Sequence, residues 1–109
     1  LAICLGAFGA HALKSILDES MLKIYNTGSQ YHFYNTLGLF AGTLIYALKP
    51  DSKKIFISLW LMLLGMIIFS FSLYFLAILS LPILGAITPI GGTLLIIAWL
   101  TLTYGILKD

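Results

Sequence analysis

Long apolar segments without charged residues in their interior dominate this chain. Three complete segments run over residues 30–48, 55–80 and 89–107. About 20 such residues in an α-helix cross the roughly 30 Å hydrocarbon core of a bilayer. Hydrophobic residues make up 61% of the chain and charged residues only 9%, whereas a soluble domain has roughly 25% charged residues. The sequence therefore predicts an integral membrane protein.

A fourth apolar segment, residues 1–12, opens the chain, which begins with Leu1 and not with Met. It supplies only about 18 Å of helix at about 1.5 Å per residue, so we expect the first span to be truncated at its N-terminus. The segments lack the alternation of polar and apolar residues that is typical of a membrane barrel. The predicted fold class is therefore all-α: one domain over residues 1–109, built as a four-helix transmembrane bundle.

Residues 14–25 have a different pattern. Apolar side chains repeat on one helical face, and charged side chains lie elsewhere around the helix. This pattern favours a short amphipathic helix in the membrane interface, with Leu17, Met21 and Ile24 towards the bilayer or the bundle. The alternative is an irregular, solvated loop.

Short loops are predicted at residues 49–54 and 81–88, and the pair Thr88-Pro89 favours the start of the last span. The lysines indicate the orientation, because cytoplasmic loops are enriched in basic residues. One side of the membrane would hold four lysines, and the other side two. The four are Lys49, Lys53, Lys54 and Lys108, and the two are Lys14 and Lys23. Both termini are therefore predicted to be cytoplasmic in a bacterial inner membrane, or on the matrix side of a mitochondrial inner membrane.

Small residues recur at helical spacing in every span. Helices in lipid associate through the close backbone contact that small residues permit. We expect Gly38 and Gly42 to face another helix at close backbone range. The predicted helix-packing positions are Gly6, Ala10, Gly38, Gly42, Gly65, Gly91 and Gly92.

Four polar residues, His11, Gln30, His32 and Asn35, are predicted near the same non-cytoplasmic membrane edge. We expect His11 to point inward, because an imidazole without a partner is costly in hydrocarbon. A hydrogen bond between the first two spans is the favoured interpretation, and the alternatives are ligation of haem or a metal and transfer of a proton. No catalytic set of residues is found, and the sequence predicts no catalytic, metal or cofactor site.

Four motifs carry a family resemblance: "GAFGAHAL" (6–13), "QYHFYNTLGL" (30–39), "FSFSLY" (69–74) and "ITPIGG" (87–92). Together they resemble the small bacterial membrane proteins called domain of unknown function 423, the YgdD/YwdK-like proteins. The resemblance implies a four-helix inner-membrane protein and no established activity. His11 matches the family motif. The chain departs from the family at Asn35, where the family usually has His, and at Phe71, where it usually has Gly.

Two functions remain open. The first is a non-enzymatic accessory, assembly or membrane-organising subunit, whose partners are the lipid bilayer and other membrane protein subunits or copies of itself. The alternative is a small oligomeric transporter or channel for a neutral or lipophilic solute, using the polar cluster around His11 and His32. The net charge is only +2 and the lysines are scattered, which argues against a nucleic-acid partner.

Overall fold

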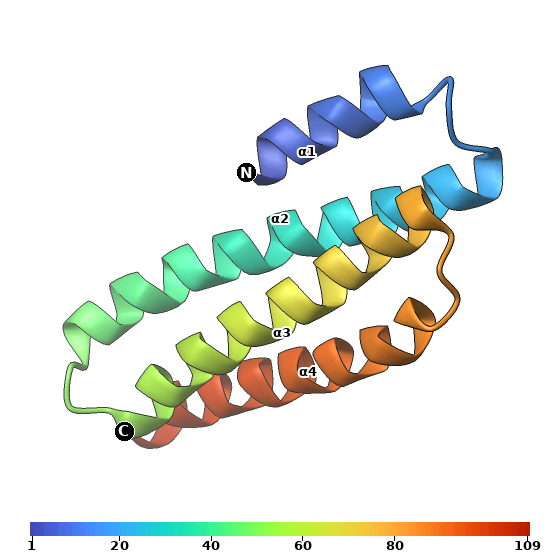
Figure 1. Cartoon of the computed structure of the whole chain (residues 1–109). Coiled ribbons are helices and arrows are strands. Elements are labelled where there is room, and N and C mark those ends of the chain that lie inside the picture. The colour runs from blue at the N-terminus through green and yellow to red at the C-terminus, as the bar shows by residue number, and fades with distance from the viewer.

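The computed structural model describes residues 1–109 and consists only of helices and short links (Figure 1). In chain order, the elements are α1 (Ala2–Phe8), the π-helix η1 (Gly9–Leu13), α2 (Glu19–Leu48), α3 (Lys53–Leu79) and α4 (Leu84–Lys108). The prediction of an all-helical fold is confirmed. The helices α3 and α4 are long and apolar enough to cross a membrane, with mean hydropathies of 2.4 and 1.8.

The helices are arranged side by side in the order of the chain. The helix α3 lies between α2 and α4 and packs on both, and α1 lies against the outer side of α2 (Figure 1). The molecule measures 48 × 26 × 14 Å along its principal axes, so it is long and thin. Because α3 lies between them, α2 and α4 meet through side chains such as Asn35 and Trp99.

The separate surface helix expected over residues 14–25 is not formed. The helix α2 begins at Glu19, where the Asp18 carboxylate accepts the Met21 N–H at 2.8 Å, and it continues without a break to Leu48. Residues 14–18 form the link to η1. The amphipathic pattern has another cause, because its apolar side chains pack against α1 and α3 around Tyr25.

The helix α4 begins at Leu84, five residues before the expected start at Pro89. The backbone N–H groups of Leu84, Gly85 and Ala86 bond to the carbonyls three residues earlier, which fixes the first turn upstream of the proline. Pro89 therefore lies inside the helix, and Thr88 donates to the Leu84 carbonyl instead of capping. A proline in the second turn removes one backbone donor, a loss that helices in membranes tolerate.

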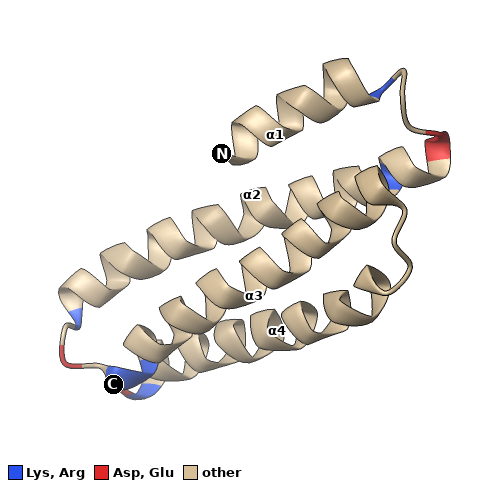
Figure 2. Cartoon of the chain, viewed as in Figure 1, with Lys and Arg blue, Asp and Glu red and all other residues tan.

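Charged residues lie at the two ends of the molecule, and the helical region between them carries none (Figure 2). One end has the link before α2, where Asp18 and Glu19 lie between Lys14 and Lys23. The other end joins the start of α3 to the end of α4, because Asp109 accepts hydrogen bonds from Ser52 at 2.5 Å and from Lys54 at 3.2 Å. The charge-free region is therefore flanked on both sides by polar links.

Candidate functional site

The structure separates the four polar residues that the sequence placed together. His32 and Asn35 are buried in α2, at 5% and 3% exposure, whereas His11 and Gln30 are exposed. The expectation that His11 points inward is wrong. Gly9 and Leu13 are the buried residues of η1, and Gly9 packs on the Tyr25 ring. His11 lies midway between them in the chain and so faces away from α2.

His32 still joins two helices, but through a partner that the sequence analysis did not identify. Its Nδ1 lies 2.9 Å from the Tyr74 hydroxyl of α3, and both side chains are buried. Tyr74 in turn stacks on Tyr25 with 4.8 Å between the ring centroids, and the Tyr25 hydroxyl donates to the Leu5 carbonyl at 2.6 Å. A continuous set of aromatic and polar contacts therefore connects α1, α2 and α3.

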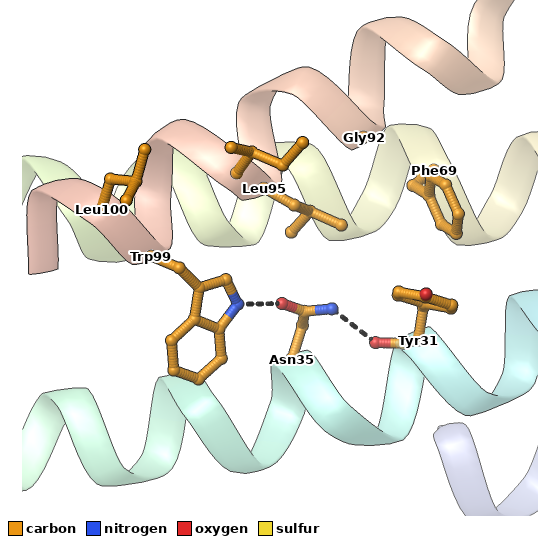
Figure 3. Close-up of a pocket in the computed structure, with 8 residues that line it drawn as sticks. Tyr31, Asn35, Phe69, Gly92, Leu95, Trp99 and Leu100 are labelled. Atoms are coloured by element: carbon orange, nitrogen blue, oxygen red, sulfur yellow. Dashed lines mark hydrogen bonds between the residues drawn. The ribbon is translucent and has the colours of Figure 1, made fainter. Parts of the chain in front are cut away.

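Asn35 joins α2 to α4. Its Oδ1 accepts a hydrogen bond from Trp99 Nε1 at 2.9 Å, and its Nδ2 donates to the Tyr31 carbonyl at 2.8 Å (Figure 3). An amide nitrogen carries two N–H groups, so one of them remains available. Trp99 lies in the middle of the expected last span, and a tryptophan at that depth needs a partner for its N–H. The position of Trp99 in the span is therefore the sequence feature that could have indicated a hydrogen bond from its indole N–H.

A groove of about 450 Å³ opens beside the Asn35–Trp99 pair. Residues of α2 form one wall, residues of α4 form the other, and Phe69 of α3 forms the floor (Figure 3). Gly92 lowers the α4 wall, because its missing side chain leaves space next to the Phe69 ring. The lining residues are Tyr31, Asn35, Phe69, Gly92, Leu95, Ile96, Trp99 and Leu100.

The composition of this groove defines what it can bind. Six of the eight lining residues are hydrophobic, and the polar groups that converge on it are those of Tyr31, Asn35 and Trp99. Pockets for apolar ligands typically combine such walls with a few placed polar groups. The groove can therefore accept an apolar group and give it one or two hydrogen bonds. No set of three His, Cys, Asp or Glu side chains that could hold a metal lies together in the structure.

The predicted packing glycines differ in what they contact. A Cβ on Gly65 would lie 3.0 Å from the Leu95 backbone nitrogen, and one on Gly91 would overlap the Phe69 backbone nitrogen. Gly38 and Gly42 instead face side chains, Trp99 and Leu59, and not a helix backbone. Gly6 and Gly92 have room for a Cβ at ordinary contact distance, and Ala10 is exposed.

Two glycines that pack against the backbone of another helix, Gly28 and Gly105, were not predicted. A Cβ on Gly28 would lie 3.0 Å from the Ser70 carbonyl, and one on Gly105 would lie 3.2 Å from the Ile55 nitrogen. The Ser70 hydroxyl is fully buried and has no hydrogen-bond partner. The signal that could have found both glycines is their place inside a helix, where the low helix propensity of glycine calls for a packing reason.

Comparisons with known proteins agree on one family. The family model "Protein of unknown function (DUF423)" matches residues 5–92. The UPF0382 membrane protein YwdK of Bacillus subtilis is 41% identical over 108 residues, covering 99% of this chain and 88% of that protein. A UPF0382 membrane protein of Staphylococcus epidermidis is 43% identical over 110 residues, covering 99% and 87%.

A relative from a third bacterium gives the same result. The UPF0382 membrane protein of Haemophilus influenzae is 42% identical over 107 residues, covering 98% of this chain and 85% of that protein. No solved structure matches the chain. The names of these bacterial relatives support a membrane location.

Proposed function

The chain belongs to the DUF423 family of proteins of unknown function, and from this premise we propose that it is a non-enzymatic accessory or assembly subunit of the bacterial inner membrane. In this proposal it acts by holding another membrane protein against its own helices. The groove between α2 and α4 is the contact site.

The proposal includes a four-span topology. The helices α3 and α4 have the length and hydropathy of membrane spans. The part of α2 from residue 30 onwards lies beside them and has no charged residue before Lys49, and α1 with η1 forms a short apolar helix next to α2. The lysine-rich end, with Lys53 and Lys54, is cytoplasmic in this topology because of the enrichment of basic residues on that side.

One observation carries the proposed function: three buried polar side chains, His32, Asn35 and Ser72, join neighbouring helices. His32 bonds to Tyr74 between α2 and α3, and Asn35 bonds to Trp99 between α2 and α4. Ser72 lies 2.6 Å from the Thr88 hydroxyl between α3 and α4. In lipid such contacts hold helices together, and here they form a scaffold that presents an apolar outer surface.

The groove supports an assembly role because of its position and shape. A helix has all its backbone groups bonded internally and so is the structure that can pack against this protein inside a bilayer. Gly92 permits close approach to α4 in the way that small residues do in membrane interfaces. The remaining Asn35 N–H can donate to a polar side chain of the partner.

Site-specific photo-cross-linking in intact membranes tests the assembly role. Two neighbouring isoleucines of α4 form a matched pair, because both are exposed and only Ile96 lines the groove. A photoreactive residue at position 96 should give a discrete protein adduct, and one at Ile97 should not. Lipid adducts alone at position 96, or the same adducts at both positions, would contradict the proposal.

A second candidate function is movement of a neutral or lipophilic solute. The observation that favours it is the same groove, since Asn35 offers an unused N–H within apolar walls. For this function the solute-binding site is the groove and not the region of His11 and His32 expected from the sequence. His11 is exposed, and the His32 side chain is bonded to Tyr74. Solute flux into proteoliposomes with wild type and with Ile96→Trp, which fills the groove, tests this function. Flux equal to that of empty liposomes would remove it.

A further inference from the structure

A second concave surface lies on the amino-terminal part of α2, away from the groove already described. It has a volume of about 360 Å³, and five of its six lining residues are polar. The lining residues are Glu19, Leu22, Lys23, Asn26, Thr27 and Gln30. Glu19, Lys23, Asn26 and Gln30 are spaced three or four residues apart, so they follow one face of the helix. We call this surface the α2 polar face.

The charged and amide side chains of the α2 polar face do not bond to the rest of the protein. Glu19 and Lys23 have the i, i+4 spacing that allows a salt bridge, yet the salt bridge of this structure joins Lys54 to Asp109 at the opposite end. Thr27 is occupied, because its hydroxyl donates to the Lys23 carbonyl at 3.0 Å. The carboxylate, the ammonium and the two amides are therefore free to bind a ligand.

The order of these groups along α2 is regular. With about 1.5 Å of rise per residue, Lys23 lies about 6 Å from Glu19 along the axis, and Gln30 lies about 16 Å from it. Beyond Gln30 the same face becomes apolar, and Leu37 is 64% exposed. Figure 2 shows the acidic and basic positions at the beginning of α2, followed by a helix without charge. The sequence of groups is thus acid, base, amides and then apolar surface.

We propose that the α2 polar face binds a membrane phospholipid with a phosphoethanolamine headgroup. The order of its groups matches that of the lipid: Glu19 accepts from the lipid ammonium, Lys23 donates to the phosphate, and Asn26 and Gln30 donate to the ester carbonyls. The acyl chain then follows the apolar surface at Leu37. One acid and one base complement a zwitterion, whereas an anionic lipid calls for a cluster of basic residues.

This inference rests on the membrane placement of α2 in the proposed function, and not on the assembly role. A primary ammonium can donate hydrogen bonds to Glu19, and the quaternary ammonium of a phosphocholine lipid cannot. The site therefore distinguishes two zwitterionic lipids that have the same charge. It also distinguishes both from phosphoglycerol lipids, which have no cation for Glu19.

Native mass spectrometry of the purified protein in mild detergent tests the inference. The probes are phosphatidylethanolamine, phosphatidylcholine and phosphatidylglycerol with identical dioleoyl chains. We expect phosphatidylethanolamine to be retained preferentially, and Glu19→Gln to remove its advantage over phosphatidylcholine. Lys23→Gln should lower retention of all three lipids about tenfold, because it removes one charge-assisted hydrogen bond to the phosphate.

Asp51→Asn and Lys53→Gln are the matched controls, since they make the same changes at exposed positions at the opposite end of the molecule. They should leave the lipid preference unchanged, and Glu19→Asp should largely preserve it. Equal retention of the three lipids by the wild type, or an unchanged preference in Glu19→Gln, would overturn the inference. If the wild type shows no lipid preference but keeps the cross-link at position 96, the lipid site is overturned and the assembly role stands. If it shows the lipid preference but no cross-link at position 96, the assembly role is overturned and the lipid site stands.

Discussion

The contact between α3 and α4 and the attachment of α1 to α2 are built in different ways. The helices α3 and α4 approach so closely that a Cβ on Gly65 would lie 3.1 Å from the Gly91 carbonyl. Buried side chains such as Met62, Leu95 and Ala98 fill the rest of their shared length. The short helix α1 is instead held mainly by side-chain contacts with Tyr25.

The difference shows how helices are held together where water is absent. Apolar surface gains little from leaving lipid, so dense packing and hydrogen bonds must supply the stabilisation. Close packing along two helices of 27 and 25 residues adds many small dispersion contacts. An element of 7 residues followed by a π-helix cannot gather as many, so its position depends on a few directional contacts.

Gly91→Ala should have the largest effect, because it inserts a methyl group against the Phe69 backbone, which cannot move aside. We expect the free energy of unfolding to fall by about 1–3 kcal/mol, measured by denaturant titration in mild detergent with circular dichroism. Gly92→Ala is the control, because its Cβ would lie 3.5 Å from the Phe69 ring. It should keep or slightly raise stability, because alanine favours the helix. Equal losses in both variants would contradict the close α3–α4 contact.

Gly9→Ala should have the next largest effect and should be confined to α1. A Cβ there would overlap the Tyr25 ring, which is itself held by Tyr74. We expect a loss of about 1 kcal/mol, at the low end for overpacking because a side chain and not a backbone is displaced. Amide hydrogen exchange should rise in residues 2–13 and stay unchanged in α3 and α4.

The control is Gly6→Ala, whose Cβ has room at 3.4 Å from Ser29. Faster exchange throughout the protein would show that α1 belongs to the same cooperative unit.

The sequence was sufficient for the helical fold because long apolar segments without charge have few alternatives in lipid. It was not sufficient for the boundaries of α2 and α4. Pro89 is a strong local signal for a helix start, but the turn at residues 81–83 begins the helix earlier. The amphipathic pattern at Met21 and Ile24 reports burial, and burial against a neighbouring helix gives the same pattern as burial in a membrane surface.

The candidate site was predicted only in part, for a related reason. Periodicity places His32 and Asn35 on one side of α2, and both are buried. It does not say which residues of other helices face them, so Tyr74 and Trp99 were missed. His11 was misplaced because its inward orientation was inferred from the cost of an unpaired imidazole in lipid, whereas the buried residues of η1 are Gly9 and Leu13, on the opposite side of the helix.

Tyr25→Phe should have a smaller effect than either glycine variant. It removes the hydroxyl that donates to the Leu5 carbonyl but keeps the buried ring. The carbonyl keeps its backbone partner, the Gly9 N–H, so no buried acceptor is left unsatisfied. We expect a loss of about 0.6 kcal/mol, the average for side-chain hydrogen bonds in membrane helices, with faster exchange in α1. The control is Tyr46→Phe, which changes an α2 tyrosine outside the α1 contact. A loss as large as that of Gly9→Ala would show that the hydrogen bond, and not packing, positions α1.

The smallest effect should come from acidification at the end where α3 begins and α4 finishes. The hydrogen bond from Ser52, followed by the one from Lys54, holds the pKa of the Asp109 carboxyl below its usual range. A lowered pKa in the folded state means that the charged form adds stability above the usual pKa, and that this contribution is lost as the pH falls through the lowered value.

Because the carboxylate is at the surface, the effect should be a small shift in melting temperature. Melting curves of the wild type and Asp109→Asn in detergent should differ at about pH 7 and converge below about pH 4. Asp18→Asn provides the comparison at the other end, since the Asp18 carboxylate caps α2 by accepting from the Met21 N–H. A difference between wild type and Asp109→Asn that stays constant across this range would show that the Asp109 charge does not join α3 to α4.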